Sequence, residues 1–141
     1  MNPVFRIIPL VLYYIVGVIS LIMAIKSIFA KSYLPFHENA AKKPWNEVEW
    51  SLKAVILSLL RLGGLGFLTI SILLIVCTGI NYFNQNNIYK YVIPFIALVF
   101  CTGLFFNNYL LYKSTKSKTP WKGSLYAIII ILTGIILSIL I

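Results

Sequence analysis

Acidic side chains are scarce in this sequence. Only three of the 141 residues are acidic, and all three fall between positions 38 and 49. None of them lies inside a long apolar run, so no carboxylate is available there to relay protons across a membrane. This scarcity argues against a proton-coupled transporter.

Ligands for metals and cofactors are also scarce. The chain has one histidine, His37, and two cysteines, Cys77 and Cys101, whereas a zinc site needs several closely placed Cys, His or carboxylate ligands. No Cys-x-x-Cys pair indicates a redox site, and "GGLG" lacks the lysine of a nucleotide-binding loop. Cys77 is expected near one end of its helix and Cys101 near the middle of the next, so we expect no disulfide. The sequence predicts neither a metal nor a cofactor.

Charge of either sign is rare, and apolar residues predominate. Charged residues make up 11% of the chain and hydrophobic residues 60%, against roughly 25% and 45–50% in soluble domains. Four apolar runs, at about residues 4–30, 53–80, 91–111 and 123–141, reach the roughly 20 residues that a helix needs to cross a bilayer. We expect one transmembrane domain over residues 1–141. It should be an all-α bundle of four antiparallel neighbouring helices, with a short interfacial segment between the first two and with the first run retained as a helix.

Basic residues gather on one side of the expected bundle. Only Arg6 and Lys90 flank the other side. Because short loops rich in lysine stay in the cytoplasm, we expect loops 31–52 and 112–122 inside and both chain ends outside, in a bacterial inner membrane. The segment "KSTKSK" should then touch anionic headgroups, at about 1 kcal/mol per charge, rather than a nucleic acid. The lysines on the basic side are Lys26, Lys31, Lys42, Lys43, Lys53, Lys113, Lys116, Lys118 and Lys122.

Local signals predict where helices begin. Asn46 is a favoured N-cap with Glu49 three residues later, a capping box that predicts a helix from near Asn46. Glu49 is also spaced to pair with Lys53 one turn on. Thr119 is expected to cap the last helix, with a proline at its first position.

The stretch "LSLLRLGGLGFL", residues 57–68, places a charge inside an apolar run. A charged side chain near the middle of a transmembrane helix costs at least about 2.5–3.5 kcal/mol and usually faces the bundle interior. Arg61 should lie roughly 15 Å deeper than Trp50 at 1.5 Å per residue. We therefore expect its stripe to face inward. That stripe is Ala54, Ser58, Arg61 and Leu65.

Three glycines follow the arginine. At about 100° per residue, Gly63 and Gly66 fall on the face opposite Arg61, and Gly64 flanks the arginine stripe. Glycines in membrane helices commonly let neighbouring backbones approach closely. We expect them to pack against another helix, either of the same chain or of a second copy.

Polar side chains from separate segments are expected at the depth of Arg61. They predict a polar pocket on the cytoplasmic side, suited to an anionic lipid or a small anion. Two alternatives stay open: Arg61 is purely structural, bound to helix-end carbonyls or to a lipid phosphate, and Glu38 pairs with Lys42 rather than reaching Arg61. The predicted members of the pocket are Arg61, Ser58, His37, Glu38, Asn107, Asn108 and Tyr126.

The segment "LPFHENAAKKPWNEVEWSLKAVILSLLRLGGLGFL" resembles one that recurs in small four-helix bacterial membrane proteins of unknown function. The pattern is Phe-His, a turn of small residues and lysine, Trp, an acid, and then a long helix with Arg and a glycine-rich exit. The resemblance covers about a quarter of the chain and implies no activity. The residues that carry it are Phe36, His37, Trp45, Glu47, Arg61, Gly63, Gly64 and Gly66.

Three functions follow from these features as expectations. The first is a non-enzymatic accessory or scaffolding subunit of the inner membrane that self-associates or joins a larger complex. The second is a binding or transport protein whose pocket around Arg61 takes an anionic lipid or small anion. The third is a lipid-modifying enzyme that uses His37 and Glu38. In each case the expected partners are membrane lipids, and no nucleic acid is expected.

Overall fold

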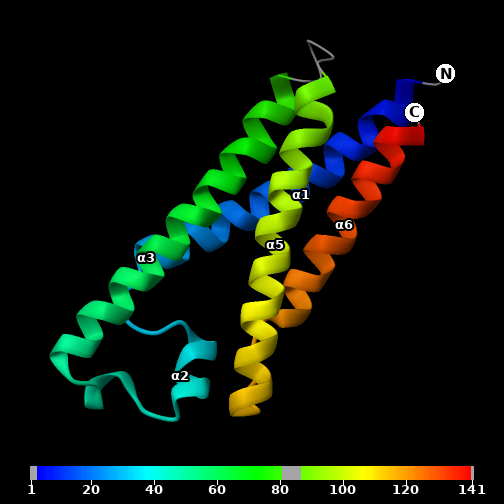
Figure 1. Cartoon of the computed structure of the whole chain (residues 1–141). Helices are drawn as coiled ribbons and strands as arrows, with labels where there is room; N and C mark the ends of the chain where they lie inside the picture. The colour runs from blue at the N-terminus through cyan, green and yellow to red at the C-terminus, as the bar shows by residue number, and fades with distance from the viewer. Residues whose placement is uncertain (1–2, 81–86, 141) are drawn as a thin grey trace.

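The computed structural model of the chain describes residues 3–80 and 87–140 (Figure 1). Four helices are long and apolar enough to cross a membrane: Ile7–Ile28, Trp50–Ile80, Lys90–Thr115 and Trp121–Leu140. The predicted all-α bundle with four spans is confirmed, and the fold is compatible with a multi-pass membrane protein. The elements are α1 (Pro3–Ile28), α2 (Pro35–Ala41), the 3₁₀ helix η1 (Trp45–Glu47), α3 (Trp50–Ile72), the π-helical turn η2 (Leu73–Cys77), α5 (Asn87–Thr115) and α6 (Trp121–Leu140).

The two ends of the bundle differ. Figure 1 shows the N- and C-termini together at one end, called here the termini end, and α2 at the other, called the α2 end. α1 and α5 run toward the α2 end, whereas α3 and α6 run back, so neighbouring spans are antiparallel. The short helix α2 occupies the predicted segment between the first two spans.

Two helix pairs make up the bundle. α1 packs along α3, α5 packs along α6, and α1 also contacts α6. Small residues let α1 and α3 approach closely. A Cβ added at Gly17 of α1 would lie 2.8 Å from Cγ1 of Ile75 in η2, and one at Gly64 of α3 would lie 2.7 Å from Cγ1 of Ile28. Glycine is therefore the residue that fits at both contacts.

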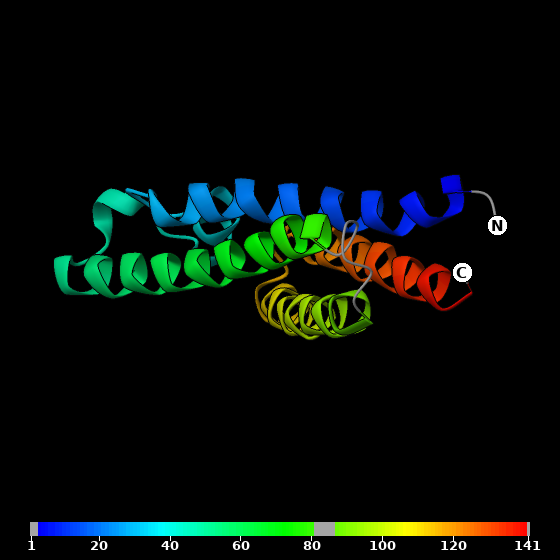
Figure 2. The ribbon, with the colours of Figure 1, turned by 90° about the horizontal axis from the view of Figure 1, so that it is seen from above.

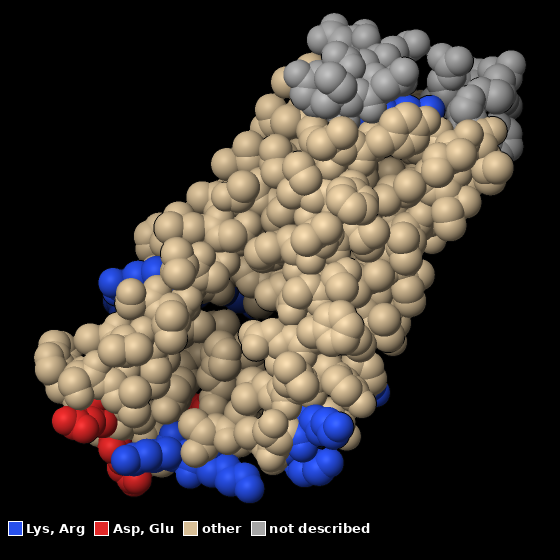
Figure 3. Space-filling model, in the orientation of Figure 1, with Lys and Arg blue, Asp and Glu red and all other residues tan. Residues whose placement is uncertain are grey.

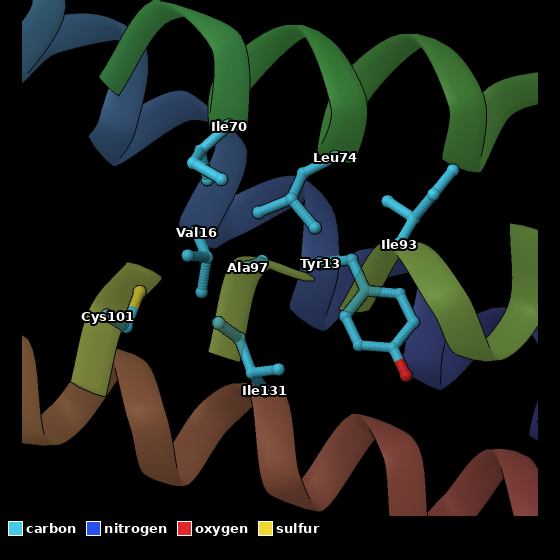
Figure 4. Close-up of a cluster of buried hydrophobic side chains, with 8 residues drawn as sticks. All are labelled: Tyr13, Val16, Ile70, Leu74, Ile93, Ala97, Cys101 and Ile131. Atoms are coloured by element: carbon cyan, nitrogen blue, oxygen red, sulfur yellow. The ribbon is translucent and has the colours of Figure 1, made fainter. Parts of the chain in front are cut away.

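The buried core joins the two pairs near the termini end. Leu74 and Ile131 are fully enclosed there, each with 0% of its surface exposed. Figure 4 shows how side chains from α1, α3, η2, α5 and α6 gather between the helices. Within a membrane such packing stabilises through van der Waals contact rather than through removal of water. The cluster is Tyr13, Val16, Ile70, Leu74, Ile93, Ala97, Cys101 and Ile131.

The α2 half of the bundle has little buried surface in the described chain. Residues 50–69 of α3 bury only Gly64, and no residue is buried in 102–115 of α5 or in 121–130 of α6. Figures 1 and 2 show that α3 leans away from α5 toward the α2 end, with α1 alongside it. The two helix pairs therefore meet tightly near the termini and diverge toward α2.

α3 begins later than predicted. The sequence indicated a helix from near Asn46, but η1 is followed by an extended Val48 (φ −76°, ψ 136°), and α3 starts at Trp50. Glu49 is the residue just before α3, and it makes no side-chain cap hydrogen bond, so the predicted capping box is wrong. Val48 is only 5% exposed. Its burial explains the break, because an extended backbone at this position turns the side chain inward ahead of the helix.

Candidate functional site

Arg61 lies on the outer face of α3, contrary to the prediction. Arg61 and Ser58 are both exposed, as are Ala54 and Leu65 on the same stripe. The reason is the packing of α3, which turns Gly64 toward α1 and a different face toward α5, and leaves the arginine side uncovered. Among the residues that the structure describes, no inward-facing pocket forms around Arg61.

α1 ends before it reaches the level of Arg61. Gly64 contacts Ile28, the last residue of α1. Arg61 precedes Gly64 by about one turn, so it lies level with the linker that leaves α1 and not alongside the α1 helix. α3 continues past this level toward the α2 end, so its residues 50–63 extend beyond the end of α1. Arg61 lies eight residues from Lys53, about 12 Å along α3, so its long side chain has to extend toward the α2 end to bring the guanidinium group closer to the headgroups.

The three glycines have three different surroundings. Gly64 is buried against α1, and a Cβ at Gly66 would lie 3.0 Å from Cε2 of Phe100 in α5. Both of these glycines therefore lie against other helices of the same chain. A Cβ at Gly63 would meet nothing within 4 Å. Gly63 therefore contributes no packing within one chain.

The polar candidates on α5 and α6 are not brought together around Arg61. Asn108 donates from Nδ2 to Oγ of Ser124 (3.3 Å), and its backbone carbonyl accepts from Oγ1 of Thr119 (2.8 Å). Thr119 thus links α5 to the start of α6 instead of capping α6 as predicted. Asn107 is exposed, and Tyr126 is 62% exposed. Asn108 is a structural residue of the α5–α6 connection.

α2 carries the remaining candidates. The ring of His37 lies 4.0 Å from that of Phe36, and its Nδ1 is buried without a hydrogen-bond partner among the described residues. Burial lowers the pKa of His37 below its usual 6.5, so the neutral imidazole is favoured. Glu38 is exposed. Its contact with Lys42 is a backbone hydrogen bond of 3.0 Å from the Lys42 N–H to the Glu38 carbonyl.

A contact that sequence reasoning missed ties α2 to the α5–α6 connection. Ser117 donates from Oγ to the backbone carbonyl of Asn39, 2.9 Å away, and α2 also contacts α5. Ser117 belongs to "KSTKSK", where the lysines drew attention and the serine gave no signal of its own. This contact places α2 at the end of the bundle where the two helix pairs diverge.

Lys53 takes a different partner from the one predicted. Its Nζ donates to the carbonyl of Asn46 at 3.4 Å and lies 5.7 Å from the centre of the Trp45 ring. Trp45 in turn meets the ring of Tyr33 edge-on at 4.8 Å. The expected pairing with Glu49 is replaced by a cation–π contact, which holds the Lys53 ammonium group at the start of α3.

A hollow separates α3 from α5 in the α2 half. The two helices meet at Phe67 and Phe100, whose ring centroids are 5.3 Å apart. Figure 3 shows the surface hollowed between the two helices beyond this contact, on the side toward the α2 end. Figure 1 shows α2 at that end, where it contacts α5. The hollow is therefore closed toward the termini by this contact and lies between α3 and α5, with α2 at its far end.

Two glycines face this hollow. Gly63 comes four residues before Phe67 and Gly103 three residues after Phe100, so both continue the faces on which α3 and α5 meet. A Cβ added at either glycine would meet nothing within 4 Å. Asn107 follows Gly103 by one more turn on the same face of α5. The hollow is thus open at the position of each glycine.

The facing stripe of α3 runs from apolar to basic. It continues from Gly63 through Leu60 and Ile56 to Lys53, at the three- and four-residue spacing of one helix face. The side chains of Leu60, Ile56 and Lys53 are half-buried, whereas those of Leu59 and Leu62 are exposed. The stripe therefore joins an apolar wall to a cation at its α2 end.

Charge is concentrated at the same end. Arg6 and Lys90 lie toward the termini, so ten of the twelve basic residues and all three acidic residues lie toward α2, which gives seven net positive charges there. Figure 3 shows lysine and arginine groups along this end, with the acidic groups beside them. The α2 end is a cationic surface next to an open part of the bundle.

Comparison with known proteins gives no match. No family model, no curated protein and no solved structure is significantly similar to the chain. The resemblance of residues 34–68 to a family of four-helix membrane proteins stays a prediction.

Proposed function

We propose that the chain is a non-enzymatic membrane protein that binds anionic phospholipid at its α2 end. The observation that supports this most strongly is that two features occur in the same half of the bundle. The half of the bundle that lacks a buried core is also the half that carries ten of the twelve basic residues. An unfilled space between transmembrane helices is filled by lipid, and nearby lysines attract anionic headgroups at about 1 kcal/mol each.

The proposal moves the predicted anion site away from Arg61. The cations now invoked are the lysines around the α5–α6 connection and at the start of α3. With the α2 end in the cytoplasmic leaflet of a bacterial inner membrane, they would meet the leaflet surface that attracts basic segments. That orientation follows from the lysine distribution and is part of the proposal.

Lipid selectivity tests this function. The protein is purified in a mild neutral detergent, and retained phosphatidylglycerol and phosphatidylcholine are compared by native mass spectrometry. We expect phosphatidylglycerol to be preferred. Replacing Lys113, Lys116 and Lys118 together by Gln should lower that preference about 100-fold, if each charge contributes about 1 kcal/mol. Lys90→Gln, at the termini end, is the matched control and should change nothing.

Equal retention of the two lipids by the unaltered protein would contradict the proposal. So would a triple Lys→Gln variant that keeps the full preference. Either result would leave the lysines as determinants of membrane orientation only.

A second candidate is the accessory or scaffolding subunit expected from the sequence. The observation that favours it is that Gly63 and Gly103 are open, because small residues are typical of faces where membrane helices associate. A helix of a second copy or of a larger complex would then enter the hollow. Partner polypeptides retained in the same native spectra would support this candidate.

A further inference from the structure

We infer that the hollow between α3 and α5 is the seat of one acyl chain of an anionic phospholipid, with the headgroup among the lysines of the α2 end. This inference rests on the proposed function and gives the bound lipid a position and an orientation. It uses three features: the length of the hollow, its open glycines and the charge at its mouth.

The length of the hollow fits one leaflet. Ten residues separate Gly63 from Lys53, which corresponds to about 15 Å along a helix. Half of a bilayer core of about 30 Å is also about 15 Å. An acyl chain that starts at the level of Lys53 therefore ends near Gly63, just short of the Phe67–Phe100 contact that closes the hollow.

The walls suit a hydrocarbon chain. Leu60 and Ile56 offer half-buried apolar surface on α3. Gly63 and Gly103 leave open space on both helices, with no atom within 4 Å of a Cβ built on either. A slender chain can occupy this space by van der Waals contact alone, without moving the helices apart.

The mouth suits a phosphate group. Lys53 is held in place by the Asn46 carbonyl and the Trp45 ring, and its stem lies on the same stripe as Ile56 and Leu60. With seven net positive charges at this end, the headgroup that fits is anionic.

Substitutions that fill the hollow with a side chain test the inference. Gly63→Leu and Gly103→Leu each place a bulky side chain in the hollow from opposite walls, and the open surroundings of both glycines mean that the fold should be kept. Gly79→Leu is the matched control, because its Cβ also meets nothing within 4 Å but it lies at the termini end of the α3 span. Retention of phosphatidylglycerol is measured by native mass spectrometry, with helicity and thermal unfolding recorded for each variant.

We expect both hollow variants to retain phosphatidylglycerol about tenfold more weakly and the Gly79→Leu protein to retain it fully. Unchanged retention in both hollow variants would overturn the inference, as would an equal loss in all three. A dimer that dissociates on Gly63→Leu would also overturn it, because the hollow would then be an interface between copies. If the hollow variants bind normally while the Lys→Gln variant does not, the proposed function survives and only the acyl-chain seat is wrong.

Discussion

Gly64 of α3 lies against Ile28, the last residue of α1, so closely that a Cβ on Gly64 would come 2.9 Å from the Ile28 backbone nitrogen. This contact fixes how far α3 extends past the end of α1. It therefore sets the level of Arg61 and the length of α3 wall that is left to face the hollow.

Gly64→Ala should destabilise the bundle. The added methyl group has to displace backbone as well as side-chain atoms of Ile28, and such overpacking costs about 1–3 kcal/mol. The measurement is unfolding in mixed micelles titrated with sodium dodecyl sulfate and followed by circular dichroism. Gly63→Ala, one residue away in open space, should leave the midpoint unchanged. Equal destabilisation by the two substitutions would show that the α1–α3 contact is not where the structure places it.

Ile131→Ala should also destabilise, for the opposite reason. Ile131 has 0% of its surface exposed within the core cluster, so truncation leaves a cavity, at a cost of about 2–5 kcal/mol. Ile129→Ala removes the same atoms from a side chain that is 51% exposed and should have little effect. The same unfolding assay compares them. A similar loss from both would contradict a core placed at the termini end.

Arg61→Leu should be nearly neutral for stability. The side chain is exposed, and surface substitutions usually change stability by no more than about 0.5 kcal/mol. It should also leave phosphatidylglycerol retention unchanged, because Arg61 is on the face of α3 that points away from the hollow. A drop in stability of about 2 kcal/mol or more, the scale expected when the partner of a buried charge is lost, would restore the inward-facing pocket that the sequence suggested.

His37 should titrate below its usual pKa. It is the single histidine of the chain, so its imidazole signals in an NMR titration are unambiguous, and burial lowers its pKa from 6.5. The unfolded chain then binds more protons than the folded one just below pH 6.5, so stability rises with pH in that range and is lost as the pH falls toward the folded pKa. The free energy of unfolding is therefore lowest in acid, and the loss due to His37 is absent above about pH 6.5.

The control for this titration is His37→Gln, which should remove the loss of stability between pH 6.5 and the folded pKa. A neutral detergent keeps the micelle from shifting the midpoint. An NMR titration midpoint of His37 at or above pH 6.5 would mean that its ring faces water and that α2 does not pack against α5.

The sequence was sufficient for the spans because hydrocarbon thickness fixes how many apolar residues a helix needs. It was less reliable at boundaries that depend on tertiary contact. The start of α3 is the clearest case: Asn46 and Glu49 have good capping chemistry, but the burial of Val48 breaks the helix there. Thr119 is another, since its hydroxyl group bonds to Asn108 across to α5 and not within its own helix.

The position of the site was not predicted from the sequence. The three glycines lie on different sides of α3. The sequence does not indicate that Gly64 contacts α1 while Gly66 contacts α5. The depth of Arg61 was predicted along its own helix from Trp50, and α3 does begin at Trp50. The sequence did not indicate that α1 ends level with Gly64, which leaves residues 50–63 of α3 without α1 beside them.

The occupant of the hollow can be identified directly by crosslinking from its wall. Leu60 is replaced by a leucine analogue that carries a diazirine, the protein is irradiated in vesicles of equal phosphatidylglycerol and phosphatidylcholine, and the adducts are identified by mass spectrometry. Leu62, 65% exposed on another face of α3, reports the surrounding bilayer when it is replaced in the same way. We expect mainly phosphatidylglycerol at position 60 and both lipids at position 62. The same lipid ratio at the two positions, or a polypeptide adduct at position 60, would contradict a bound anionic lipid in the open half of the bundle.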